Sequence, residues 1–150
     1  MGKLKRKQEN NKISKQGLKI KCLFMNDHDT ILFSFKYLTN QDRYNLKGFK
    51  GSKNLNAFHD CLNRMGTDGW ESLRNKNKFQ GGRELLEYSQ INFNALDPQN
   101  ELNLAKDTKV WVIRFGGNKY RLIGYRSKKC QAIFHILGIE RDHSAYDHGS

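Results

Sequence analysis

The feature that most constrains the fold is a series of three apolar runs, rich in β-branched and aromatic residues, in the last forty residues of the chain. The runs cover 110–115, 119–126 and 132–139, and short polar segments separate them. A Gly-Gly-Asn turn at 116–118 joins the first two, and a Gly-Asn pair between two such runs is a strong hairpin signal. The sequence therefore predicts a three-stranded antiparallel meander.

Segments upstream of the meander add further strand-like patterns. Residues 18–25 and 30–38 predict two strands that can pair as a hairpin, and 44–49 predicts a short extra strand. Residues 83–88 form too short a run to assign, and the polar stretch 92–109, which holds the only proline, predicts a connecting loop. We expect the N-terminal strand or hairpin to extend the C-terminal sheet.

Helical periodicity appears between the two groups of strands. Apolar residues at three- and four-residue spacing predict an amphipathic helix that starts after Asn54 and ends at Gly66. Asp68 and Glu71 have capping-box spacing, which predicts a second short helix through Leu73. The fold class expected from this order is α+β, with a small antiparallel sheet packed against two helices.

Charge divides the chain into two parts. The formal net charge is +12, and residues 1–21 carry eight Lys or Arg against the single acid Glu9, which is +7 of that total. Because such a run buries too little apolar surface to fold, we expect a basic, flexible arm over 1–21 and one α+β domain over 22–150. The arm can serve solubility alone, or it can bind a polyanion such as nucleic acid.

Two further patterns bear on the cellular context. No run approaches the roughly 20 apolar residues that span a membrane, and the N-terminal residues lack the apolar core of a signal peptide. The three cysteines show no CxxC spacing, which predicts reduced thiols rather than a disulfide framework or a zinc knuckle. We expect a cytoplasmic protein with no membrane partner.

Groups that transfer protons or bind phosphate crowd the meander and the segment after it. Metal-free RNA cleavage needs a base for the 2′-hydroxyl, positive charge for the phosphorane and an acid for the leaving 5′-oxygen. Arginine forks onto phosphate oxygens, histidine titrates near neutral pH, and tyrosine can exchange a proton or stack on a base. The candidate catalytic residues are Arg121, Arg126, Arg141, His143, Tyr146 and His148.

Strand alternation sorts some of these candidates. Arg121 and Arg126 fall on opposite faces of a regular strand, so a single site does not readily use both. His135 lies in a run that is apolar on both faces, which indicates a central strand. We therefore expect His135 to be a core histidine with a satisfied hydrogen bond rather than a catalytic one.

Two other groups of residues surround the meander. His143 and His148, with Asp147, make a weak metal pattern unless the fold places a third ligand beside them, so we expect no metal and no cofactor. Basic residues near the turns of the meander are expected to contact the RNA backbone. They are Arg114, Lys119, Lys128 and Lys129.

The hairpin Phe115-Gly-Gly-Asn-Lys-Tyr-Arg-Leu-Ile123, within an order of strand, helix pair and antiparallel meander, resembles the RelE/HigB-like toxins of the RelE/ParE superfamily. Arg121 matches the hairpin arginine of that family, and Arg141 and Tyr146 resemble its later pair of a basic residue and a tyrosine. The likeness covers residues 54–148. It implies a RelE-like fold and the activity of a toxin that cleaves mRNA, a metal-independent endoribonuclease or mRNA interferase.

The resemblance also implies a substrate, products and partners. The substrate would be mRNA, with ribosome-bound mRNA suggested by family analogy, and the products would carry 2′,3′-cyclic or 3′-phosphate and 5′-hydroxyl ends. A cognate antitoxin protein would cover the basic surface. Two alternatives stay open, a non-catalytic nucleic-acid-binding module and a ParE-like topoisomerase poison, since fold resemblance alone does not separate these activities.

Overall fold

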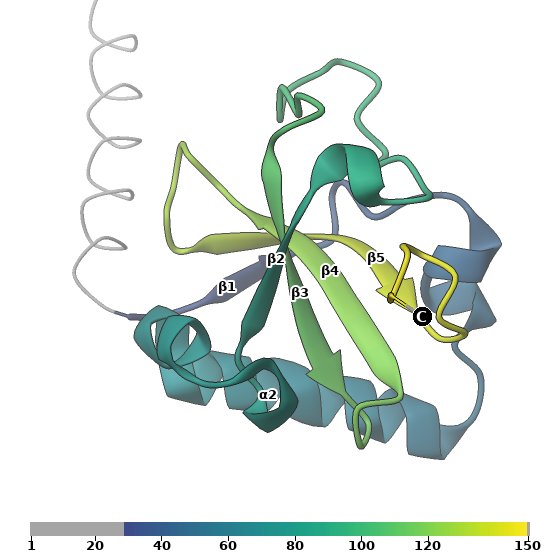
Figure 1. Ribbon diagram of the computed structural model, residues 1–150, viewed down its shortest axis with the longest axis vertical. Helices are drawn as coiled ribbons and strands as arrows, with labels where there is room; N and C mark the ends of the chain where they lie inside the picture. Colours follow the sequence, from purple (N-terminus) through teal and green to yellow (C-terminus); the bar gives the residue numbers. More distant parts are fainter. Residues whose placement is uncertain (1–28, 150) are drawn as a thin grey trace, which may run out of the picture.

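The computed structural model describes residues 29–149 of the chain. A five-stranded sheet forms its centre, in the order β1-β5-β4-β3-β2, and helix α2 (Ser52–Asn75) lies across one face of it (Figure 1). The strands are β1 (Leu32–Ser34), β2 (Arg83–Glu87), β3 (Lys109–Phe115), β4 (Tyr120–Arg126) and β5 (Ile133–Glu140). The general α+β class expected from the sequence is confirmed.

The C-terminal meander is present as predicted. Strands β3, β4 and β5 pair antiparallel in chain order. Gly116, Gly117 and Asn118 in the first turn all have left-handed backbone angles, with φ of 59°, 65° and 65°. Glycine adopts such angles without strain and asparagine tolerates them, so the turn residues are the ones that this hairpin requires.

The two edge strands differ from the sequence expectation. Strand β1 pairs with β5 in parallel, so the sheet is mixed, and the prediction of a purely antiparallel sheet was wrong. The proposed hairpin partner, 18–25, lies outside the described residues, as does the basic arm over 1–21. Strand β2 forms from the run that was too short to assign, and it pairs antiparallel with β3.

The predicted strand at 44–49 is instead helical. Two short 3-10 helices, η1 (Asp42–Tyr44) and η2 (Leu46–Gly48), occupy this segment. The side chain of Asn45 accepts a hydrogen bond from the Lys47 backbone N–H at 2.9 Å, which caps η2 locally. Such short side-chain-to-backbone bonds compete with strand pairing, and here they prevail.

Helix α2 combines the two predicted helices into one element with a kink. The helix continues through Gly66, where the sequence predicted its end, and breaks at Gly69, whose φ of 78° and ψ of −179° are not helical. The Asp29 carboxylate accepts a hydrogen bond from the Glu71 N–H at 2.9 Å, directly after the kink. A residue 42 positions earlier in the chain therefore stabilises the break.

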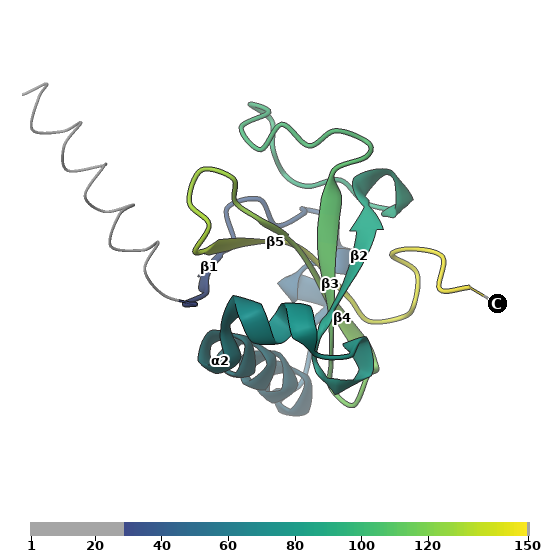
Figure 2. The ribbon, with the colours of Figure 1, turned by 60° about the vertical axis from the view of Figure 1, so that its left-hand side comes forward.

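Both faces of the sheet are buried. One face packs on α2 through a cluster that includes Met65, Trp70 and Phe134. The opposite face is covered by loops and by the C-terminal segment, with Phe93 and Tyr146 in its apolar cluster. Figure 2 shows the C-terminal segment, in yellow, on the side of the sheet away from α2. This placement determines where the residues after β5 gather.

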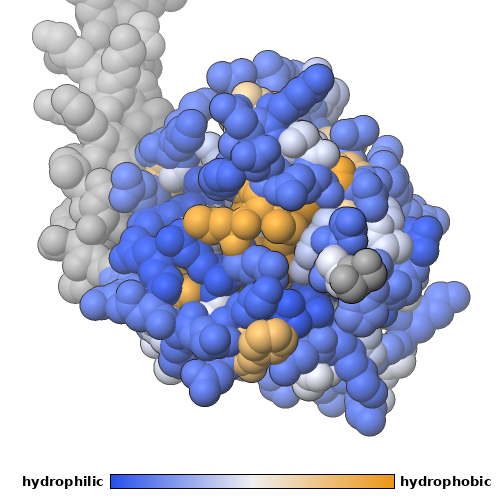
Figure 3. Space-filling view, in the orientation of Figure 1, coloured by the Kyte–Doolittle hydropathy of each residue, from blue (hydrophilic) through white to orange (hydrophobic). Residues whose placement is uncertain are grey.

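Figure 3 shows one face of the molecule, coloured by hydropathy. That face is mostly hydrophilic, with small apolar areas near its middle. Within residues 29–149, no helix combines the length and the apolarity that crossing a membrane would require.

Candidate active site

The candidate site forms where β5 ends and the chain turns back over the loop-covered face of the sheet. Glu140, the last residue of β5, has a fully buried side chain and pairs in register with Arg121 on β4, which is also buried. Residues 141–148 then fold back, so that Tyr146 joins the apolar cluster on the same face. His148 returns to within hydrogen-bond distance of Glu140.

Glu140 holds this returning segment in place. Its Oε1 accepts a hydrogen bond from the Ala145 backbone N–H at 2.8 Å and lies 2.8 Å from Nε2 of His148. Its Oε2 is buried and has no hydrogen-bond partner among the described residues. A buried carboxylate needs hydrogen bonds or a positive partner to offset its lost hydration, so Glu140 strongly favours a hydrogen-bonded orientation of the His148 ring.

Three rings lie close together beside the carboxylate. The rings of Tyr146 and His148 have centroids 4.0 Å apart, and those of His143 and His148 are 4.9 Å apart and nearly perpendicular. His143 has a left-handed backbone with φ of 57°, which directs the chain back toward His148. Left-handed angles are uncommon for residues other than glycine and concentrate at functional sites. The exposed His143 imidazole and the His148 imidazole, whose side chain is 22% exposed, therefore lie side by side next to a buried phenol.

Tyr146 and Arg121 form the inner layer of the site. The Tyr146 hydroxyl is buried and has no hydrogen-bond partner among the described residues. Burial raises the pKa of this phenol, and the nearby Arg121 guanidinium opposes that shift only in part. Nη1 of Arg121 donates to the backbone oxygens of Asn118 at 2.6 Å and Tyr120 at 3.1 Å. Arg121 is thus a buried positive charge whose Nη1 is already hydrogen-bonded, and it does not present a free guanidinium to a phosphate at the surface.

A pocket opens next to His143. It is lined by residues of the 88–92 segment and of the returning C-terminal segment, namely Gln90, Asn92, His143, Ser144, Tyr146 and Asp147. Asn92 anchors the returning segment, since its N–H donates to Ala145 O at 2.7 Å and its Nδ2 donates to Ser144 O at 2.8 Å. The pocket can admit a polar ligand to His143 and Tyr146.

Arg141 is placed differently from the sequence expectation. Its guanidinium donates to the backbone oxygens of Gly48, Asp42 and Arg43, so it ties the η1–η2 segment to the end of β5. The neighbouring Asp142 pairs with Arg43 at 2.8 Å. Hydrogen bonds from Ser144 and Arg43 lower the pKa of the Asp142 carboxyl. Both Nη atoms of Arg141 thus donate within the fold, whereas its buried Nε has no hydrogen-bond partner among the described residues.

Arg126 lies on the opposite face, as strand alternation predicted. Its guanidinium stacks over the Trp70 ring at 4.2 Å and donates from Nε to Gln131 O at 2.8 Å. Lys128 and Lys129 are exposed in the following turn. His135 is half-buried, with its ring 4.9 Å from that of Tyr37.

The sequence predicted satisfied hydrogen bonding for His135, and this prediction was wrong for its Nδ1 atom. Its buried Nδ1 has no hydrogen-bond partner among the described residues. Burial, with a smaller effect of Lys36, lowers the pKa of this imidazole. His135 is therefore a neutral, packed side chain at neutral pH and stays outside the cluster around Glu140.

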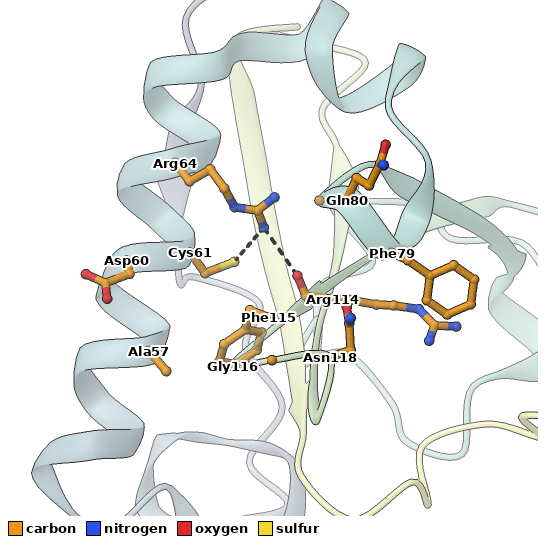
Figure 4. A pocket seen from close by; sticks show the side chains of 12 residues that line it. Ala57, Asp60, Cys61, Arg64, Phe79, Gln80, Arg114, Phe115, Gly116 and Asn118 are labelled. Atoms are coloured by element: carbon orange, nitrogen blue, oxygen red, sulfur yellow. Dashed lines mark hydrogen bonds between the residues drawn. The ribbon is translucent and has the colours of Figure 1, made fainter.

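A second pocket lies between α2 and the β3–β4 hairpin (Figure 4). Arg64 reaches across from α2 and donates to Arg114 O at 3.2 Å and to Cys61 Sγ at 3.9 Å. The Arg114 guanidinium stacks on the Phe79 ring at 4.4 Å and lies 3.4 Å from a Glu84 oxygen. Arg64 and Arg114 thus both line this pocket, although the Arg114 side chain lies on the same face of the sheet as that of its cross-strand neighbour Arg121. The exposed Lys119 belongs to the same hairpin.

Two residues of these sites were missed by sequence reasoning. Glu140 is an acid at the end of an apolar strand with two histidines shortly after it, a signal that could have marked a carboxylate–imidazole pair. Arg64 follows Cys61 by three positions on one helix face, which gives no functional signal by itself. Its place in a pocket depends on the hairpin that packs against the helix.

Comparisons of the chain with protein-family models, with curated proteins and with solved structures gave no match. The resemblance to RelE/HigB-like toxins therefore rests on the sequence motifs alone, and it enters below as part of a proposal.

Proposed function

We propose that the protein is a toxin-like, metal-independent endoribonuclease that cleaves mRNA. The observation that carries the proposal is the ring cluster of His143, His148 and Tyr146, in which His143 and Tyr146 line a pocket and His148 lies against the buried Glu140 carboxylate. Two imidazoles at one surface can supply both the base and the acid of a transesterification. The RelE/HigB-like hairpin motif supports the same reaction class.

The chemistry follows from the hydrogen bond of His148. When Nε2 of His148 donates to Glu140, the free lone pair lies on Nδ1, which can accept the proton of the ribose 2′-hydroxyl. The 2′-oxygen then bonds to phosphorus, and the bond from phosphorus to the 5′-oxygen breaks as protonated His143 donates a proton to that oxygen. The products are a 2′,3′-cyclic phosphate, which water can open to a 3′-phosphate, and a 5′-hydroxyl.

The buried Arg121 can stabilise the transition state through its positive charge. Arg121 lies next to the Tyr146 hydroxyl and lowers the energy of negative charge that develops at the pocket. Because its side chain is buried, we assign it a positioning and electrostatic role rather than direct contact with phosphate. The candidate contacts to the RNA backbone are the residues named from the sequence, Arg114, Lys119, Lys128 and Lys129.

The proposal removes two residues from the sequence-based list of catalytic residues and adds one positioning residue. Arg141 is left out because its donors bind backbone oxygens of the η1–η2 segment. Arg126 is left out because it stacks on Trp70 on the other face of the sheet. Glu140 is added as the residue that orients His148. By family analogy we propose ribosome-bound mRNA as the substrate, a cognate antitoxin as the protein partner and the cytoplasm as the location.

Induced expression with mapping of transcript 5′ ends tests the proposal. Wild type should generate new 5′ ends within mRNA, and His143→Ala, His148→Ala and Tyr146→Phe should reduce them. His59→Ala, a change at an exposed histidine on α2, is the matched control and should cleave like wild type. Toxicity with unchanged transcripts would instead favour a topoisomerase poison. RNA binding without new ends, in wild type and variants alike, would favour a non-catalytic binding module.

A further inference from the structure

Three side chains with metal-ligating atoms converge at the end of β5. Glu140, His143 and His148 each offer one ligand atom, and these atoms all lie within 4.8 Å of one another. We infer that they form a binding site for a divalent transition-metal ion of the zinc class. Among residues 29–149, no other group of three histidine, cysteine or acidic side chains comes this close together.

The donor set fits zinc chemistry. Two imidazoles and one carboxylate are a common three-residue zinc set, and they leave the fourth tetrahedral position open to water or substrate. Zinc–ligand bonds of about 2.0–2.2 Å place tetrahedral ligand atoms about 3.4 Å apart. Since the ligand atoms here lie within 4.8 Å of one another, the widest pair needs to close by at most about 1.4 Å. His143 is exposed, the His148 side chain is 22% exposed, and both residues follow the strand in a turn, where the backbone can make this adjustment.

The buried carboxylate gives an independent reason to expect a cation here. Glu140 is fully buried and its Oε2 has no hydrogen-bond partner among the described residues. A metal ion would neutralise this carboxylate while Oε1 keeps its bond to the Ala145 N–H. The ion would take the place of a proton shared by His148 Nε2 and Glu140 Oε1, which lie 2.8 Å apart.

The geometry of His143 supports the same arrangement. Its left-handed backbone turns the ring back onto His148, at a centroid distance of 4.9 Å. Two imidazoles held this close can each present a ring nitrogen to one metal ion. A ligand that binds both rings would therefore stabilise the turn that positions them.

The inference that this site binds a metal does not depend on the proposed ribonuclease activity. The effect of metal binding on that activity does rest on the proposed function. A His148 ring that binds the metal through Nε2 carries its proton on Nδ1, so it no longer offers a lone pair to the 2′-hydroxyl. We therefore expect Zn²⁺ to inhibit RNA cleavage, whereas chelation restores it. Binding itself is measured without RNA, so failure of the metal site and failure of the nuclease proposal remain distinguishable.

The test uses the full chain, freed of metal, with Zn²⁺ in a calorimetric titration. Wild type should bind one ion at this site, and His143→Gln and His148→Gln should each weaken binding by about 10-fold to 100-fold or more, as the loss of a metal-site residue commonly does. Glu140→Gln should do the same, with circular dichroism to show that it folds. His59→Gln is the matched control, since His59 lies beside Asp60 on α2 and away from the cluster.

A second measurement reports the ligand atoms. Co²⁺ in place of Zn²⁺ should give the visible absorption of a four- or five-coordinate site, without the near-ultraviolet band of thiolate coordination. A thiolate band would assign the metal to cysteine and overturn the inference. So would the absence of binding to wild type, or equal Zn²⁺ affinity in wild type and in both exposed histidine variants. These two variants decide the matter even if Glu140→Gln fails to fold.

Discussion

Replacement of Arg141 by alanine separates a structural role from a catalytic one. The guanidinium donates to the backbone oxygens of Gly48, Asp42 and Arg43, the last two at 3.0 and 2.6 Å. These bonds join η1 and η2 to the end of β5, on the face of the sheet that carries the candidate site. We therefore expect Arg141→Ala to destabilise the fold and to loosen the η1–η2 segment first.

The magnitude follows from the number and kind of bonds lost. A hydrogen bond to a charged group contributes about 1.5–3 kcal/mol, and a buried acceptor left unpaired costs a similar amount. Two of the three acceptors are near solvent, where water can replace the guanidinium. The net loss in the free energy of unfolding should thus be about 2–4 kcal/mol rather than the sum of three full bonds. This loss corresponds to a fall in Tm of roughly 10 °C for a domain of this size.

Urea denaturation of wild type, Arg141→Ala and Arg43→Ala measures the effect. Arg43 is exposed and makes one ion pair with Asp142, so its loss should leave the free energy of unfolding nearly unchanged. At a temperature where Arg141→Ala is fully folded, its RNA cleavage should approach that of wild type. Near-normal stability together with lost cleavage in Arg141→Ala would refute this reasoning and return Arg141 to the catalytic group.

Three further perturbations test other parts of the structure. Gly69→Ala should lower the free energy of unfolding by roughly 2 kcal/mol, measured by urea denaturation, because φ is 78° and a Cβ would lie 2.3 Å from the Asp29 carboxylate. Gly66→Ala should instead raise the free energy of unfolding by up to about 1 kcal/mol. Equal effects of the two substitutions would contradict the placement of the kink. Because burial lowers the pKa of His135 in the folded state, the unfolded state binds this proton more tightly, and the free energy of unfolding should fall as the pH drops below about 6.5. A His135→Gln variant that loses as much stability as wild type between pH 7.5 and 5.5 would contradict this. Burial raises the pKa of the Cys61 thiol to about 11, so mass spectrometry should find alkylation at Cys61 at pH 8 only after unfolding, and rapid native labelling would show that the thiol is accessible.

Local signals predicted the part of the fold that depends on neighbouring residues. The meander follows from alternating apolar runs and from turn residues that tolerate left-handed angles, such as Asn118. Strand alternation also placed Arg121 and Arg126 on opposite faces correctly. Both results come from backbone geometry that repeats over a few residues, which is why the sequence alone sufficed.

Long-range contacts decided the features that were missed. The parallel pairing of β1 with β5 joins residues about a hundred positions apart, and no local pattern encodes it. The kink at Gly69 depends on Asp29, and the orientation of Arg141 depends on carbonyl groups 93 to 99 residues away. Glu140 became a candidate only because the chain returns His148 to it eight residues later. Tertiary packing thus places the guanidinium of Arg141 against backbone oxygens of the η1–η2 segment, and it brings Glu140, which the sequence did not mark, next to His148.

The central claim is that the His143–His148 pair cleaves RNA, and it is tested most directly by the ends of the products. Purified protein, in the presence of a chelator, is incubated with mRNA both free and bound to ribosomes. Wild type and His59→Gln should yield 2′,3′-cyclic phosphate or 3′-phosphate ends and 5′-hydroxyl ends. His148→Gln should cleave about 100-fold to 10,000-fold more slowly, the usual cost of losing a general acid or base. Cleavage by His148→Gln at the wild-type rate, or products with 5′-phosphate ends, would contradict the account.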